Sequence, residues 1–108
     1  MVENIKMDFD IIVEPEISHV WWNTGYGYMR VVVVVKAILK TEDRQYVFAT
    51  EKVEKAVYLS SDPAEIDQII DAVEKAKERV YKQIQAFIAL RDRALKVLSQ
   101  LGEVKEYL

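Results

Sequence analysis

Apolar residues recur at spacings of three and four throughout the C-terminal part of the chain. Counting in sevens from Ile66 gives one apolar row, and the positions three residues later give a second row. The rows are Ile66, Val73, Val80, Phe87, Ala94, Leu101 and Leu108, and Ile69, Ala76, Gln83, Leu90, Val97 and Val104. A heptad repeat held over this length is the pattern of a coiled coil, so we predict one long amphipathic helix over residues 62–108.

Three residues at the start of this segment favour a helix N-terminus. Asp62 suits the N-cap, Pro63 the first helical position, and Glu65 the capping-box position three residues after the cap. No glycine or proline follows before Gly102, so nothing interrupts the helix earlier. Gln83 is the one polar residue in the two rows. It either sets the register of a coiled coil or lies where the helix crosses the sheet edge and reaches solvent.

The N-terminal residues alternate between apolar and polar with the period of a β-strand. Residues 5–13 place apolar side chains on one side and charged side chains on the other, which predicts a strand with one buried face. Pro15 has no backbone N–H, so we expect it to end this strand before a short extended piece at 17–22.

Residues 26–40 contain five consecutive valines, Val31 to Val35, whose β-branched side chains favour a strand. Apolar groups on both faces indicate a central strand, covered on both faces, or covered on one face and used for contacts on the other. After a reversal at 41–44, we expect residues 45–59 to run back as another long strand. The alternation falters at 49–51, where we predict a β-bulge.

Together these elements predict a single α+β domain over residues 1–108. A small antiparallel sheet of three or four strands, in 1–60, packs against the long helix of 62–108. The apolar stripe of the helix is wider than one interface requires, so we expect one flank to contact the sheet and the other a second copy's helix. This gives a coiled-coil-like homodimer that could pair into a tetramer. The predicted dimer contacts are Val80, Phe87, Leu90, Ala94, Val97 and Leu101.

The composition excludes several classes of protein. The 108 residues include no cysteine, so this chain has no disulfide framework, thiol nucleophile or thiolate metal site. No apolar run approaches the roughly 18 residues that span a bilayer, and the first residues lack the apolar core of a signal peptide, so we predict a cytoplasmic protein without a membrane partner. Low glycine and proline contents suit a thermophile. A net charge of −3 argues against general duplex-DNA binding.

Aromatic residues are concentrated between residues 21 and 30, where glycines and an arginine accompany them. Such a stretch resembles a platform on which unpaired bases stack beside cations that bind phosphates. Alternatively, the tryptophans pack under the helix and the tyrosines brace the sheet edge. Because consecutive strand residues point in opposite directions, at least one tryptophan must leave the core face. The predicted stacking residues are Trp21, Trp22, Tyr26 and Tyr28, and the predicted phosphate contacts are Arg30, Lys36 and Arg44.

Catalytic chemistry has little support in the sequence. Asp8, Asp10 and Glu14 share one side of a predicted strand and could bind a hard cation such as magnesium, but such rows are more often solvated faces that discourage edge aggregation. His19 is the only histidine and has no identifiable orienting partner for general-base catalysis. We therefore predict no catalytic residues, no metal site and no cofactor.

The layout as a whole, a strand-rich half containing WWNTGYGYMR and VVVVVK followed by a heptad helix, resembles the archaeal ThermoDBP-type single-stranded DNA-binding proteins. The resemblance implies a sheet bearing exposed aromatic and basic residues, a dimer formed through the helix, and sequence-tolerant binding of single strands. We predict a non-enzymatic protein that binds single-stranded DNA or RNA. The alternative is a small homodimeric interaction or scaffold protein with no nucleic-acid role.

Overall fold

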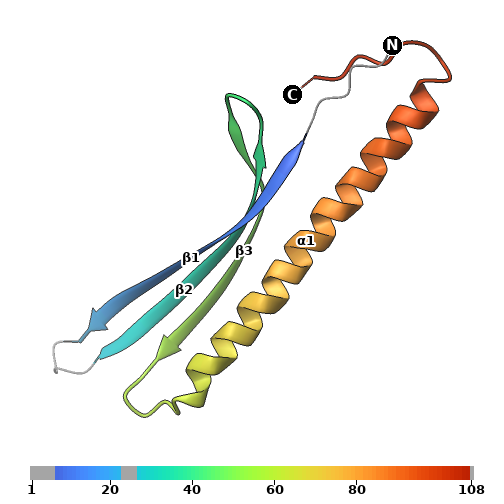
Figure 1. Cartoon of the computed structure of the whole chain (residues 1–108). Coiled ribbons are helices and arrows are strands. Elements are labelled where there is room, and N and C mark those ends of the chain that lie inside the picture. The colour runs from blue at the N-terminus through green and yellow to red at the C-terminus, as the bar shows by residue number, and fades with distance from the viewer. Residues whose placement is uncertain (1–6, 23–26, 108) are drawn as a thin grey trace.

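The computed structural model describes residues 7–22 and 27–107 of the chain. It contains three strands, β1 (Asp8–Trp21), β2 (Gly27–Lys40) and β3 (Gln45–Val57), followed by one helix, α1 (Ala64–Leu98). The strands form an antiparallel sheet in the order β1-β2-β3, and α1 lies along one of its faces (Figure 1). The predicted α+β fold, an antiparallel sheet with one long C-terminal helix, is therefore confirmed.

The first strand is longer than the sequence predicted. β1 continues through Pro15, which pairs with Val33 of β2, and the pairing extends from Asp8 opposite Lys40 to Trp21 opposite Gly27. The expected break at Pro15 was wrong. β1 has a neighbour on one side only, and an edge strand tolerates proline because many of its backbone N–H groups have no partner strand to bond.

The valine run occupies the central strand, as predicted. Val35 and Ala37 of β2 are fully buried and form the core with side chains of α1. Between β2 and β3 the register shifts, because Ala37 pairs with Ala49 whereas Ile38 pairs with Val47. The irregularity thus lies at Phe48, just before the predicted position. Phe48 packs against Phe9 and Phe87, with ring centroids 5.2 Å and 5.1 Å away.

The covered face of α1 follows the heptad rows only in part. One row of buried and half-buried residues recurs with the ordinary helical period of about 3.6: Ile69, Val73, Ala76, Val80, Ile84, Phe87, Arg91 and Leu95. Gln83 is exposed in the chain, and Ile84 takes the buried position beside it. A straight helix drifts by about 20° per heptad, so the row that faces the sheet leaves the heptad register after Val80.

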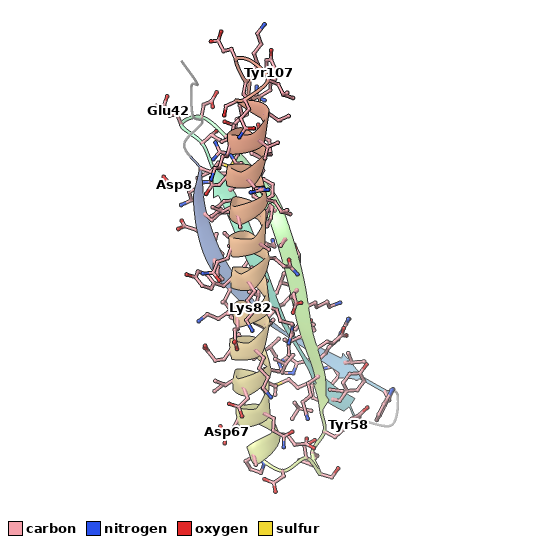
Figure 2. The ribbon with its side chains drawn as sticks, turned by 90° about the vertical axis from the view of Figure 1, so that its right-hand side faces the viewer. Asp8, Glu42, Tyr58, Asp67, Lys82 and Tyr107 are labelled. Atoms are coloured by element: carbon pink, nitrogen blue, oxygen red, sulfur yellow. The ribbon has the colours of Figure 1, made fainter. Side chains whose placement is uncertain are left out.

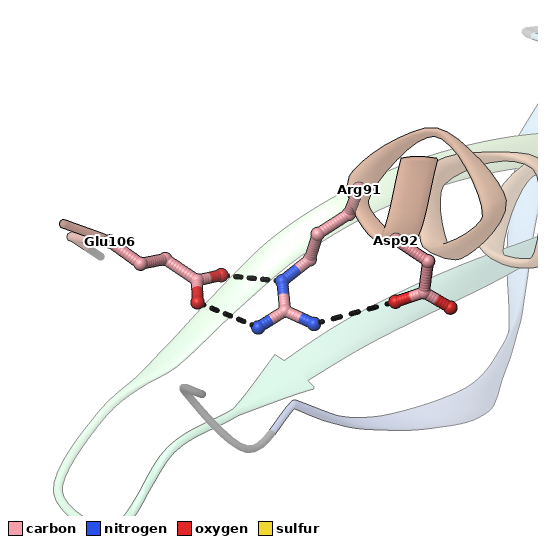
Figure 3. Close-up of polar contacts among 3 residues, drawn as sticks. All are labelled: Arg91, Asp92 and Glu106. Carbon is pink, nitrogen blue, oxygen red and sulfur yellow. Dashed lines mark hydrogen bonds and ion pairs between the residues drawn. The ribbon is translucent and has the colours of Figure 1, made fainter. Parts of the chain in front are cut away.

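The helix begins at Ala64, within two residues of the predicted start, but it ends earlier than predicted. The Asp62 carboxylate accepts a hydrogen bond from the Ala64 N–H at 2.9 Å. This N–H belongs to the first turn, where backbone donors have no carbonyl partner within the helix. α1 ends at Leu98, so the predicted extension to residue 108 was wrong. The chain then turns, and Glu106 makes a bidentate pair with Arg91, including Nη2 to Oε2 at 2.8 Å, while Asp92 lies 3.9 Å from the same guanidinium (Figure 3). This pair ties the C-terminal segment back to the helix.

The helix leaves one end of the sheet uncovered. It crosses the sheet at an angle and contacts β3 and β2 more extensively than β1. The sheet extends to one side of the N-terminal part of α1, near Tyr58 (Figure 2). That end carries the aromatic residues. Within the part of the chain that the structure describes, no helix has the length and apolar character needed to cross a bilayer.

Candidate nucleic-acid interface

The two tryptophans lie at the uncovered end of the sheet. Trp21 ends β1 and is 71% exposed, and Trp22 follows it and is 50% exposed. Their rings have different neighbours: Trp21 stacks on His19 with centroids 6.2 Å apart and planes 11° apart, whereas Trp22 contacts Tyr28 at 5.9 Å. The alternative in which both tryptophans pack under the helix is therefore wrong. Tyr26 lies outside the described residues.

Three aromatic rings from different parts of the chain meet beside Trp22. Tyr28 of β2 is half-buried and lies between Trp22 and Tyr58, whose ring centroid is 5.3 Å from its own. We call Trp22, Tyr28 and Tyr58 the aromatic cluster. Tyr58 was not among the predicted site residues. The signal that could have found it is the strand register, because Met29 pairs with Val57 and so brings the ends of β2 and β3 together.

A pocket of about 500 Å³ lies at this same end of the sheet. Most of its lining is apolar or aromatic, which suits a flat, weakly polar ring. It is lined by His19, Trp21, Gly27, Tyr28, Met29, Val57, Tyr58 and Leu59. We call it the end pocket. Trp21 lies on the sheet face that α1 covers further along, whereas Tyr28 alternates to the opposite face. Tyr58 borders the end pocket and contacts Tyr28, so the Trp21 side and the aromatic cluster meet around the end of the sheet.

Gly27 allows the close strand approach that shapes the end pocket. A Cβ atom at this position would lie 2.1 Å from the Val20 carbonyl oxygen and 2.9 Å from Cε3 of Trp21. The first contact is with backbone, so β1 would have to move.

We expect Gly27→Ala to separate the strand ends, displace the Trp21 ring and destabilise the fold by about 1–3 kcal/mol. Urea unfolding and the near-ultraviolet circular dichroism of the tryptophans measure both effects. An unchanged near-ultraviolet spectrum would contradict the expected displacement.

The predicted phosphate contacts are dispersed along the sheet. Arg30 lies on β2 near the aromatic cluster, Lys36 lies six residues further along the same strand, and Arg44 lies in the turn between β2 and β3. β2 separates Arg44 from the tryptophans by about 45 Å, at roughly 3.3 Å per strand residue. In Figure 2, Glu42 of that turn and Tyr58 are labelled at opposite ends of the sheet. Only Arg30 therefore belongs to the immediate surroundings of the aromatic rings.

The cations nearest the aromatic cluster are held by one carboxylate. Glu54 of β3 forms an ion pair with Arg30 and another with Lys52, whose Nζ is 3.2 Å from Glu54 Oε2. Hydrogen bonds from Lys52 and Arg30 lower the pKa of Glu54. The carboxylate thus stays charged at neutral pH and competes with any phosphate for both cations.

Arg30, Lys52 and Glu54 lie on the sheet face opposite α1, and acidic side chains also occupy the rest of that face. Asp10 lies 2.5 Å from Lys40 Nζ, and Glu14 lies 2.9 Å from Lys36 Nζ. The predicted solvated row of carboxylates is therefore exposed, as expected, and two of its members pair with lysines of β2. Among the described residues no group of three or more His, Asp or Glu side chains is placed to hold a metal ion.

Comparisons with protein-family models, with curated proteins and with solved structures found no match to this chain. The chemistry of the candidate interface is therefore inferred from its own side chains. Those side chains combine exposed aromatic rings, a mainly apolar pocket, and two cations that share one carboxylate.

Proposed function

We propose that the protein binds single-stranded nucleic acid, without catalysis, through the aromatic end of the sheet. The observation that carries this proposal is the joint exposure of Trp21 and Trp22 beside the end pocket. Tryptophan is usually well covered in a folded protein, so two exposed neighbouring rings point to a ligand with flat faces. Unpaired bases offer such faces whatever their sequence, and each stacking contact contributes about 1–3 kcal/mol.

Binding of a strand would use both parts of this surface. One base stacks on Trp21 over the end pocket, and a neighbouring base stacks on the rings of Trp22 and Tyr58. A phosphate beside the second base then lies near Arg30, once it displaces Glu54, and Lys52 lies further along the path of the strand on the same sheet face. A duplex hides its base faces in the stack, so this surface favours single strands over duplex.

A binding assay with a fluorescent oligonucleotide tests the proposal. The fluorescence anisotropy of a short labelled single strand is measured against protein concentration, and then repeated with the same strand in a duplex and at raised salt. We expect tighter binding of the single strand, with an affinity that falls as salt rises because phosphate contacts release counterions. Equal affinity for single strand and duplex would contradict base stacking.

Removing the competing carboxylate should strengthen binding. Glu54→Gln frees Arg30 and Lys52 for phosphates, and exposed ion pairs are weak, so we expect affinity for the single strand to rise only about two- to fivefold. The dependence on salt should also become steeper, because more cations would contact phosphates. The anisotropy titration measures both changes.

Glu51→Gln is the matched control for Glu54→Gln. Glu51 also lies on β3, but its carboxylate pairs with Arg79 of α1, at 2.7 Å from Nη2, on the helix-covered face of the sheet. Both variants remove one negative charge, so a general electrostatic effect would tighten binding equally in the two. That equality would contradict the local competition at Arg30.

We also propose that the chain forms a homodimer through α1. Two of the predicted dimer contacts are used within the chain, because Val80 is fully buried against the sheet and Phe87 packs on Phe9 and Phe48. The other four are exposed: Leu90, Ala94 and Val97 lie on one flank of the helix, and Leu101 lies in the turn that follows it. We call these four residues the C-terminal stripe. It supports the dimer proposal, and it also fits the alternative of an interaction protein whose helix contacts a different partner.

A further inference from the structure

The single chain exposes far more surface than a compact protein of its mass. Its accessible area is 8283 Å², whereas a compact monomer of 12.6 kDa exposes about 6,200 Å². Its radius of gyration is 20.4 Å, against about 13 Å for a compact chain of this length. A standard interface buries about 800 Å² on each partner, so the excess of roughly 2,000 Å² is enough for more than one contact.

Part of this excess lies on the flank of α1 opposite the C-terminal stripe. Ile70, Tyr81 and Ile88 are exposed there, and Lys77 lies in the same line. We call these four residues the second stripe. Grooves lie beside it: Ile11 of β1 and Tyr81 border both, and Ile88 borders one. At 100° per residue, the second stripe and the C-terminal stripe are about 150° apart around the helix, so each can be covered without blocking the other.

The spacing within the second stripe is the same in both directions. Successive members are separated by seven, four and seven residues, so reversing the helix places Ile70 opposite Ile88 and Lys77 opposite Tyr81. An antiparallel second copy, related by a twofold axis, would therefore match apolar residues with apolar residues. It would also place the ammonium group of Lys77, which pairs with Glu74 of its own helix, beside the Tyr81 ring of the other copy, which is a favourable contact.

The charge of the helix favours the same orientation. Residues 64–78 carry five acidic and two basic side chains, whereas residues 79–98 carry one acidic and five basic side chains. Arg79 and Arg91 pair with Glu51 and Glu106 of the same chain, and Lys82 pairs with Glu78. The C-terminal half stays basic through Arg93 and Lys96. Antiparallel helices bring unlike halves together, whereas parallel helices would bring like charges together.

From these observations we infer that the second stripe is a contact surface for another copy of this chain, packed antiparallel with its twofold axis near residue 79. This contact is separate from the proposed dimer contact at the C-terminal stripe, and it does not depend on nucleic-acid binding. If both contacts form, two pairs of chains assemble into a tetramer.

Introduced cysteines test the orientation directly, because the natural chain has none. Ile70→Cys and Ile88→Cys chains are prepared singly and then mixed, and all three samples are treated with a thiol cross-linker that spans the roughly 8–10 Å between packed helices. We expect cross-linked dimers in the mixture and little in either single variant. Cross-linking within Ile70→Cys alone would show a parallel contact and overturn the inference, as would no cross-linking in any sample.

A second variant separates this contact from the C-terminal stripe. Adding Leu90→Asp to both cysteine chains should leave the cross-link between positions 70 and 88 unchanged, because Leu90 lies on the other flank. Loss of that cross-link would show that the helices meet only at the C-terminal stripe, and it would contradict the inference. Circular dichroism checks that each variant remains helical, and light scattering on the wild-type chain must show a particle larger than one copy.

Discussion

Replacing Trp21 and Trp22 together by alanine is expected to weaken single-strand binding about thirtyfold or more. Two rings that each contribute at least about 1 kcal/mol of stacking give roughly 2 kcal/mol, and each 1.4 kcal/mol corresponds to a tenfold change in affinity. Both side chains are exposed, so the fold should tolerate their loss. The anisotropy titration with a short labelled single strand measures the change, and circular dichroism confirms the fold.

Two further variants show whether the loss comes from stacking at this end of the sheet. Phenylalanine at both positions keeps flat rings and should restore much of the affinity. Tyr107→Ala removes an aromatic ring that is even more exposed, at 82%, from the C-terminal segment, and it should leave binding unchanged. Unchanged affinity in the double alanine variant, or an equal loss in Tyr107→Ala, would contradict the proposed site.

Val80→Asp is expected to unfold the chain. Val80 is fully buried and packs in the core that includes Val35 and Ala37 of the central strand. A carboxylate placed there has no partner charge, and burying an unpaired charge costs several kcal/mol, comparable with the whole stability of a small domain. Circular dichroism and urea unfolding measure the loss of structure.

Leu90→Asp is the matched control for this prediction. Leu90 occupies the same helix but is 70% exposed, so an aspartate there should leave the folded chain intact and weaken only self-association. The heptad pattern treats Val80 and Leu90 alike, as coiled-coil contacts. A folded Val80→Asp variant that had merely lost self-association would support that pattern and contradict the observed packing.

The main elements could be predicted because their signals are local. The valine run favours a strand through its β-branched side chains, and a strand that is apolar on both faces belongs in the centre of a sheet. Asp62 followed by Pro63 marks a helix start through the hydrogen-bonding needs of the first turn. Those preferences act within a few residues, so they survive whatever tertiary packing the chain adopts.

The errors concern features that depend on neighbouring elements. Pro15 was expected to end a strand, but it lies on the edge of the sheet, where a missing donor is tolerated. The heptad count assumed that α1 packs on a partner helix. In the structure α1 is straight and packs on a sheet, so its buried residues recur with the helical period of about 3.6, and Ile84 rather than Gln83 is buried. The helix also ends ahead of Gly102, and the Arg91–Glu106 pair that holds the returning chain joins residues too far apart for pattern analysis.

The candidate site was partly visible in the sequence. Two consecutive tryptophans in a strand must point in opposite directions, which predicts that at least one is exposed. The contribution of Tyr58 and the pairing of Arg30 with Glu54 depend on the register of β2 against β3, and the sequence does not specify that register. Arg44 was grouped with the tryptophans by charge alone, and the length of the strands places it at the other end of the sheet.

Intrinsic tryptophan fluorescence during titration with a short single-stranded oligonucleotide tests the central claim most directly. Trp21 and Trp22 are the only tryptophans in the chain, so the whole signal comes from the proposed stacking surface. We predict saturable quenching by the single strand and much weaker quenching by the same sequence as a duplex. Fluorescence that stays unchanged as single strand is added, or that is quenched equally by duplex, would contradict binding through these rings.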